Sequence, residues 1–142
     1  PFDQYNPELW EQVMQVNING PIWMTQALLP LLQASDDASV VFTSSSVGRK
    51  GRAYWGAYSV SKFATEGFVE VLADELDNQP NVRVNTLNPG ATRTQMRRTA
   101  YPGEDPFTLR TPEEIMPTYL WLMGPDSKGV SGQKFDAQPP RA

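Results

Sequence analysis

The sequence predicts an α/β fold with a parallel sheet, because strand-like apolar runs alternate with segments of helical period. Residues 39–44 and 82–87 are short runs rich in apolar and β-branched side chains, which is typical of buried strands. A long helical pattern precedes each run, and residues 132–136 predict a third, shorter strand. This alternation favours right-handed parallel units and indicates half of a doubly wound sheet. The inner edge of such a half-sheet is bare, so we expect an N-terminal half outside this chain to cover it.

The first predicted helix begins at Asn6 and Pro7, where asparagine caps the helix and proline takes its first position. Its apolar residues keep a helical period on average as far as Leu31. Pro21 interrupts the helix, because proline has no N–H for the carbonyl oxygen of Asn17, four residues earlier. We therefore expect a kink and a free carbonyl group at Asn17, which needs water or a side chain as partner.

The second long helix is predicted over residues 58–76, after the strand at 39–44 and a short loop. Apolar side chains form one side of it. Its acidic residues Glu66, Glu70 and Asp74 recur at four-residue steps, which predicts a charged stripe facing solvent.

The last third of the chain contains a loop and one more helix. Residues 97–110 show no regular pattern, and a segment of this length is typical of a functional loop. The sequence TPEE from Thr111 is a capping box with proline at the first helical position. This helix is expected to end at Met123 and to bend at Pro117.

Composition limits the chemistry that the chain can perform. Its 142 residues, 39% of them apolar, are enough for one compact domain. It has no histidine and no cysteine, which excludes a Ser-His-Asp or Cys-His nucleophile and the usual zinc sites, so no metal is expected. No leader and no apolar run long enough to span a bilayer occur, which predicts a soluble, cytoplasmic protein. The net charge of −4 argues weakly against nucleic-acid binding.

The side chains that point to chemistry lie in the stretch SSVGRKGRAYWGAYSVSK. Tyr58 and Lys62 are four residues apart, so in a helix they share one face, and Ser45 lies thirteen residues before Tyr58. A cation about 4 Å from a phenol is worth roughly 4 kcal/mol at an effective dielectric of about 20, or about three pKa units. We therefore expect Lys62 to lower the pKa of Tyr58 towards neutrality, where a general acid or base works best. A Tyr-x-x-x-Lys step alone also occurs by chance in many helices.

Three motifs occur together and in order. Ser45 and Gly48 form a Ser-x-x-Gly pattern, Tyr58 and Lys62 follow, and VRVNTLNPGATRT comes after the second helix. In this combination the chain resembles the short-chain dehydrogenase/reductase family over nearly its whole length. Sequence segments such as SKFATEG are similar to those of the bacterial YciK-type oxidoreductases. The resemblance implies a Rossmann-like doubly wound sheet, with residues 1–142 as the C-terminal part of a single domain and the nucleotide-binding half outside this chain.

The same resemblance implies an oxidoreductase that moves a hydride between a nicotinamide cofactor and a carbonyl or alcohol carbon. The cofactor would be NAD or NADP, with NADP slightly favoured. The family's helix pattern Val-Asn-x-x-Gly matches this chain at Asn17, whose counterpart holds a water that relays protons to the lysine. The implied catalytic tetrad is Asn17, Ser45, Tyr58 and Lys62, with Tyr58 as the general acid or base.

Cofactor contacts are also implied by the resemblance, since the residues after Pro-Gly wrap the nicotinamide in relatives. Thr92 would act through its backbone and Thr94 through its hydroxyl, and residues 97–110 would form a substrate lid. The candidate cofactor-binding residues are Tyr58, Lys62, Pro89, Gly90, Thr92 and Thr94. Where the family usually ends in Asp-Gly-Gly, this chain has DAQ from Asp136, which puts the usual C-terminal contacts in doubt.

Several assignments stay open in the sequence. Ser44 or Ser46 could supply the hydroxyl in place of Ser45. The basic residues at 49–52 are best interpreted as a solvated surface. Those at 93–98 could equally meet an anionic substrate or a phosphate. Two rival functions are an epimerase or dehydratase of the extended branch of the superfamily, and a non-catalytic binding or assembly module.

Assembly and substrate are the remaining expectations. Trp23, Phe68 and Leu72, with the small residues Ala64 and Gly67, suit helix packing across a two-fold axis, so a homodimer or homotetramer is predicted. The partner at the site would be a small carbonyl or alcohol compound that the sequence does not identify. The chain alone is expected to be inactive if the nucleotide-binding half is missing.

Overall fold

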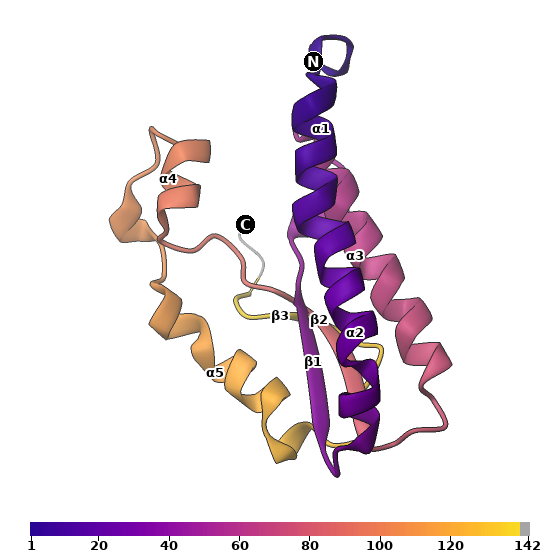
Figure 1. The fold of residues 1–142 in the computed structure, drawn as a ribbon. Helices are drawn as coiled ribbons and strands as arrows, with labels where there is room; N and C mark the ends of the chain where they lie inside the picture. The colour runs from indigo at the N-terminus through magenta and orange to yellow at the C-terminus, as the bar shows by residue number, and fades with distance from the viewer. Residues whose placement is uncertain (140–142) are drawn as a thin grey trace.

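The computed structural model describes residues 1–139 as a three-stranded parallel sheet with helices on both faces (Figure 1). The helices are α1 (Pro7–Met14), α2 (Gly20–Ala34), α3 (Gly56–Glu75), α4 (Gln95–Ala100) and α5 (Pro112–Met123), and the strands are β1 (Ala38–Thr43), β2 (Val82–Asn88) and β3 (Lys134–Asp136). Helices α2 and α3 cover one face of the sheet, and α5 lies on the other. The predicted α/β class is confirmed.

The strand order is β1-β2-β3, and both pairings are parallel. Ala38 lies opposite Val82 in the β1–β2 ladder, and Asn88 lies opposite Asp136 in the β2–β3 ladder. Every residue of β2 except its last is buried, whereas most of β1 is only half-buried. This difference fits the expectation that β1 is the strand whose outer edge needs a further cover.

The largest buried cluster lies between the sheet and the two long helices. Its members are Ala38, Val69, Leu72, Leu76, Val82 and Val84. Phe68 packs against this cluster and meets the ring of Phe42 edge-on at 5.5 Å between centroids. The prediction that Leu72 lies at a subunit interface is therefore wrong, because its side chain is buried against its own sheet, and the half-buried Phe68 also packs towards that sheet. Trp23, by contrast, is 56% exposed.

Helices α1 and α2 form one long rod, joined by a π-helical turn at Gln15–Asn19 (Figure 1). The predicted fault at Pro21 is thus accommodated by a wider turn, in which the N–H of Gly20 donates to the carbonyl oxygen of Gln15. The turn places Asn17 towards α3, where its amide nitrogen donates to the hydroxyl of Ser61 at 3.0 Å.

Part of the segment predicted to be irregular is helical. Helix α4 begins at Gln95 because the hydroxyl of Thr94 caps it, accepting a hydrogen bond from the backbone N–H of Arg97 at 3.1 Å. A 3-10 turn, Pro106–Thr108, follows with Asp105 as its cap. The last helix has the predicted capping box at Thr111.

No helix within residues 1–139 is long and apolar enough to cross a membrane. The cytoplasmic location stays a prediction.

A buried arginine ties the central strand to the end of α5. Arg83 is 4% exposed, and its guanidinium forms an ion pair with Asp37. It also donates to the hydroxyl of Ser127 at 2.9 Å and to the carbonyl oxygen of Gly124 at 2.7 Å. A buried cation is tolerated in the fold only with partners of this kind.

Replacing Arg83 by methionine should lower the free energy of unfolding by about 3 kcal/mol, because it removes the buried guanidinium that donates to Asp37, Ser127 and Gly124. Urea unfolding followed by circular dichroism measures the loss. Lys128→Met is the matched control, since Lys128 is exposed and lies 3.8 Å from the same Asp37 carboxylate. The control should lose no more than about 1 kcal/mol. Equal losses in the two variants would contradict the special role of Arg83.

Candidate active site

The carboxyl end of β1 meets the first turns of α3, and the predicted catalytic side chains gather there. Tyr58 and Lys62 lie one turn apart on α3, with the Lys62 ammonium 5.6 Å from the centroid of the Tyr58 ring. The same ammonium donates to the carbonyl oxygen of Thr43, the last residue of β1, at 2.8 Å. Gly48 allows this close approach, since a Cβ atom there would lie 2.7 Å from the Cβ of Lys62.

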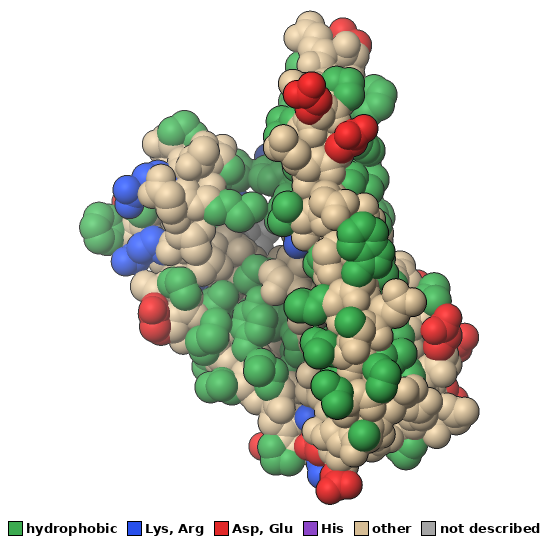
Figure 2. Space-filling view, in the orientation of Figure 1, with side chains coloured by type: hydrophobic (Ala, Val, Ile, Leu, Met, Phe, Trp, Pro, Cys, Tyr) green, Lys and Arg blue, Asp and Glu red, His purple; other side chains and the backbone are tan. Residues whose placement is uncertain are grey.

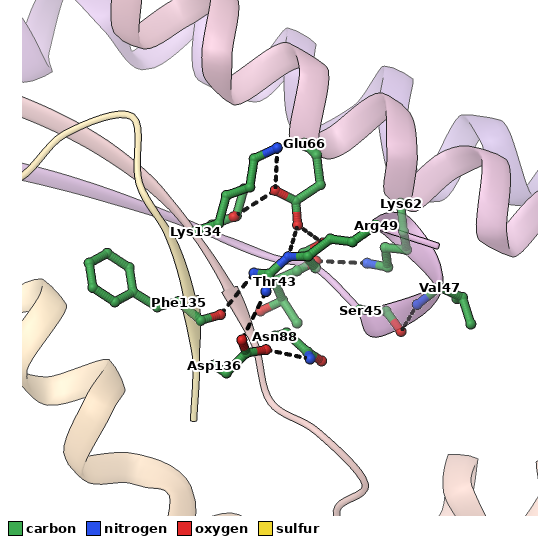
Figure 3. Close-up of polar contacts among 12 residues, drawn as sticks. Thr43, Ser45, Val47, Arg49, Lys62, Glu66, Asn88, Lys134, Phe135 and Asp136 are labelled. Carbon is green, nitrogen blue, oxygen red and sulfur yellow. Dashed lines mark hydrogen bonds and ion pairs between the residues drawn. The ribbon is translucent and has the colours of Figure 1, made fainter. Parts of the chain in front are cut away.

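Of the three serines after β1, Ser45 is the one whose side chain acts on Tyr58, since its hydrogen bonding lowers the pKa of the phenol. Its own oxygen caps the next turn by accepting from the backbone N–H of Val47 at 3.4 Å (Figure 3). Ser44 is 1% exposed and is directed elsewhere, to the carboxylate of Glu66 at 2.5 Å. Ser46 is exposed. Ser45, and not its neighbours, is therefore the serine whose hydroxyl affects Tyr58.

Burial raises the pKa of the Tyr58 phenol, and the hydrogen bond with Ser45 lowers it in part. The predicted lowering of the Tyr58 pKa by Lys62 is therefore wrong for these residues. The ammonium lies 5.6 Å from the centroid of the ring and donates to the carbonyl oxygen of Thr43, and burial is the largest influence on the phenol. Burial also lowers the pKa of Lys62. A phenol with a raised pKa stays protonated at neutral pH and is ready to donate a proton.

Asn17 reaches the site indirectly. Its amide donates to Ser61, whose hydroxyl donates in turn to the carbonyl oxygen of Tyr58 at 2.8 Å. Asn17, Thr43 and Lys62 also line one open pocket of about 310 Å³ beside β1. The space between Asn17 and Lys62 is thus open, and the water that relays protons between them stays a prediction.

The Pro-Gly turn after β2 lies at the same end of the sheet. Gly90 has φ of +74°, a conformation that favours glycine. The side-chain amide of Gln138 donates to the carbonyl oxygens of Pro89 at 2.8 Å and Ala91 at 3.1 Å. Gln138 thus holds the turn from the C-terminal segment, where the sequence departs from the family's usual ending.

The two predicted threonines have local partners. Thr92 is buried, and its hydroxyl donates to the carbonyl oxygen of Gly90 at 3.2 Å. Thr94 is exposed and uses its hydroxyl as the cap of α4.

Aromatic side chains connect Tyr58 to the segment at residues 95–110. The ring centroid of Trp55 lies 5.7 Å from that of Tyr58 and 6.0 Å from that of Tyr101. Arg52 donates to the hydroxyl of Tyr101 at 3.2 Å. This segment therefore lies beside the candidate site, as expected of a lid.

The basic residues at 93–98 mostly have partners within residues 93–110. Arg97 pairs with Glu104 at 2.6 Å and stacks 3.7 Å above the ring of Tyr101. Arg93 donates to the carbonyl oxygens of Pro106 and Leu109. The side chain of Arg98 is exposed. Anion binding by this cluster thus gains no support from Arg93 or Arg97.

Comparison with known proteins assigns the family. Residues 1–105 match the pattern of the family described as short chain dehydrogenase. The chain belongs to the short-chain dehydrogenase family. It is 62% identical to the oxidoreductase YciK of Escherichia coli K12 over 141 residues, which is 99% of this chain and 55% of that protein. The similarity to YciK-type oxidoreductases is thereby confirmed, and the chain spans about half the length of the curated relatives that it matches.

Solved structures agree with the Rossmann-like fold of short-chain dehydrogenases. A short chain dehydrogenase from Shigella flexneri superposes with a TM-score of 0.96 at 60% identity, covering 100% of this chain and 55% of that one. A second structure, a short chain dehydrogenase from Escherichia coli CFT073 complexed with NADPH, has a TM-score of 0.94 at 60% identity. It covers 98% of this chain and 57% of its own.

Two charged residues of this short-chain dehydrogenase differ from what the sequence predicted. Glu66 does not face solvent but is 3% exposed, because α3 turns it towards the ends of β1 and β2. Arg49 is not part of a solvated surface, since it pairs with Glu66 at 3.1 Å and with Asp136 at 3.0 Å (Figure 3). The charged stripe on α3 holds only at Glu70 and Asp74.

Replacing Ser45 by alanine should raise the pKa of Tyr58 further. The reason is that a hydroxyl donating to the tyrosinate oxygen stabilises the ionised form, and the variant loses that donor. The pKa is measured by absorbance titration, as the difference between each protein and its counterpart carrying Tyr58→Phe. Ser46→Ala, at an exposed neighbour, should leave the pKa unchanged. The same pKa in the Ser45 variant and the parent would contradict the assigned contact.

Proposed function

We propose that this short-chain dehydrogenase chain is the C-terminal part of a single domain, in an enzyme that transfers a hydride between NADP(H) and a carbonyl or alcohol carbon. The observation that supports the proposal most is the position of the Tyr58 hydroxyl. It lies against Ser45 and one helical turn from the Lys62 ammonium, at the carboxyl end of a parallel strand. Open α/β sheets bind their ligands at that end. The full-length protein is here this chain together with the upstream half that completes the sheet.

Each side chain has a task that its surroundings support. Tyr58, protonated at neutral pH, donates its proton to the carbonyl oxygen in the direction of reduction. Ser45 hydrogen-bonds the same substrate oxygen and holds it beside the phenol. Asn17 and Lys62 face the shared pocket, through which a proton can return to Tyr58 by way of water.

The residues present fit a nicotinamide nucleotide. An ammonium has three N–H donors, and that of Lys62 donates one of them to the backbone carbonyl oxygen of Thr43, which leaves donors for ribose hydroxyls. The Pro89–Gly90 turn, with Thr92 and Thr94, borders the place for the nicotinamide. When bound, the cofactor supplies the hydride, and the protein supplies position and the proton. NADP is favoured because similar structures from Shigella flexneri and Escherichia coli are complexed with NADP and NADPH.

Replacing Tyr58 by phenylalanine should reduce kcat for carbonyl reduction by about a thousandfold, because the proton donor is lost. The Kd for NADPH should stay within about twofold, since the phenol acts on the substrate oxygen. NADPH oxidation with a panel of aldehydes and ketones, and fluorescence titration of NADPH, measure the two quantities in the full-length protein.

Tyr54→Phe is the matched control for that experiment, because Tyr54 is 85% exposed in the same loop region. Its kcat should equal that of the parent. Full turnover by the Tyr58 variant, or no reduction of any carbonyl by the parent, would contradict the proposed function.

We also propose that the full-length protein is a homodimer or a larger homo-oligomer through the exposed sides of α2 and α3. Figure 2 shows hydrophobic side chains along the long α1–α2 rod, and the exposed ones on α2 include Trp23, Met24, Leu28 and Leu31. On α3, Gly67 is exposed and faces open space, so a partner helix can approach closely. These surfaces keep the predicted interface at Trp23 and Gly67 while removing Phe68 and Leu72 from it.

Replacing Gly67 by leucine should weaken the dimer at least tenfold (about 1.4 kcal/mol) without lowering the stability of the monomer, because a Cβ at this position meets no atom within 4 Å. Light scattering over a concentration series measures the association. Gly103→Leu is the control, since Gly103 also faces open space but lies outside both helices. A monomer mass for the parent protein at micromolar concentration would remove the interface.

A further inference from the structure

Three consecutive residues at the end of β1 contact three residues spaced at four-residue steps on α3. The carbonyl oxygen of Thr43 accepts from Lys62, the hydroxyl of Ser44 donates to Glu66, and the hydroxyl of Ser45 meets Tyr58. Two of these contacts belong to the candidate catalytic residues. The remaining contact, between Ser44 and Glu66, has no assigned role.

The Glu66 carboxylate is a buried junction between elements. One oxygen accepts from Ser44 at 2.5 Å and from the Arg49 guanidinium at 3.1 Å, and the other accepts from the hydroxyl of Thr86 at 2.8 Å. Thr86 is in β2, so one side chain of α3 is bonded to the ends of two strands. The ammonium of Lys134, in β3, lies 3.9 Å away. A buried carboxylate with this many donors is held in one orientation, because any other would leave it unpaired.

Arg49 extends the junction to the third strand and to the Pro-Gly turn. It donates to Asp136 at 3.0 Å and to the carbonyl oxygen of Phe135 at 3.0 Å (Figure 3). The other oxygen of Asp136 accepts from Asn88 at 2.7 Å, and the side-chain oxygen of Asn88 accepts from the N–H of Gly90 at 3.1 Å. The same network thus connects the Ser45 strand end with the turn proposed to border the cofactor.

We propose that Glu66 is a positioning residue for the reaction, which fixes the end of β1 against α3 so that Ser45 faces the Tyr58 hydroxyl. The inference rests on the proposed function, because it assigns Glu66 a part in that reaction. Glu66 touches neither substrate nor cofactor. It acts through Ser44, the neighbour of Ser45, and through the strand ends that Thr86 and Arg49 bring to it. A carboxylate that served only the stability of the sheet would affect unfolding but not the geometry at Tyr58.

The test is Glu66→Gln in the full-length protein, a change that keeps the shape of the side chain and removes its charge. We expect kcat to fall about tenfold, in line with the loss of a hydrogen bond to a charged group, while the Kd for NADPH stays within about twofold. Glu70→Gln is the matched control, since Glu70 is one turn further along α3 and pairs with Lys134 at the surface. Its kcat should not change.

A double-mutant cycle tests the route through Ser44. Ser44→Ala should also lower kcat, but in the Glu66→Gln background it should cost little more, because the two side chains act as one unit. Fully additive losses would overturn the inference. So would an unchanged kcat in a folded Glu66→Gln protein.

The ionisation of Tyr58 gives a readout that does not depend on turnover. If Glu66 positions Ser45, the Tyr58 pKa should be higher in Glu66→Gln than in the parent, as in Ser45→Ala, and should be unchanged in Glu70→Gln. A parent protein that reduces no carbonyl would contradict the proposed function, while this titration would still decide whether Glu66 positions Ser45.

If Glu66→Gln does not fold, Thr86→Val is the second variant. It removes one donor to the same carboxylate and should also lower kcat. A folded Thr86→Val protein with unchanged kcat and an unchanged Tyr58 pKa would then overturn the inference.

Discussion

Polar groups at the junction of β1 and α3 are taken out of water, and each must find a partner inside the protein. Within residues 1–139 no buried side-chain nitrogen or oxygen is without one. The carboxylate of Glu66 is 3% exposed, and it accepts hydrogen bonds from Ser44 just after β1, from Thr86 in β2 and from Arg49 in the following loop. We propose that these bonds fix how the strand ends lie against the helix. Ser45, Tyr58 and Lys62 occupy neighbouring places on the same strand end and helix, so their positions would follow from it.

The parallel sheet collects the other parts of the site at one end. Strands that run the same way end at the same edge, so the loop after β1 and the Pro-Gly turn after β2 become neighbours. The C-terminal segment stabilises both, through Asp136 with Arg49 and through Gln138 with Pro89. This explains how the chain keeps contacts at its C-terminal end although its sequence there departs from the family's usual ending. Tyr101, held by Arg52 and packed near Trp55, brings the segment at 95–110 beside the same edge.

Much of this could be predicted from sequence because the signals are local. The four-residue step of Tyr58 and Lys62 requires only a helix, and Pro21 alone predicts a disturbance near Asn17, which the structure contains as a π-helical turn. The inward position of Glu66 could not be predicted, since its four-residue spacing from Glu70 and Asp74 places it on the charged side of the helix. Its partners come from segments distant in the sequence, at Ser44, Arg49 and Thr86. The pKa of Tyr58 depends first on burial and then on the hydroxyl of Ser45, and sequence spacing gives neither of these influences. Thr94 is a favourable N-cap residue, so the start of α4 could have been predicted from it. The residues that follow show no regular helical pattern, and for that reason the helix was not expected.

A crystal structure of the full-length protein with NADP⁺ would show whether the junction of β1 and α3 builds a nicotinamide site around Tyr58. We expect the Lys62 ammonium within hydrogen-bond distance of a ribose hydroxyl, and the nicotinamide beside Tyr58. The contacts of Lys62 with Thr43 and of Glu66 with Ser44 should be unchanged. A nicotinamide bound away from Tyr58, or a Ser45 turned away from the Tyr58 hydroxyl, would contradict the account.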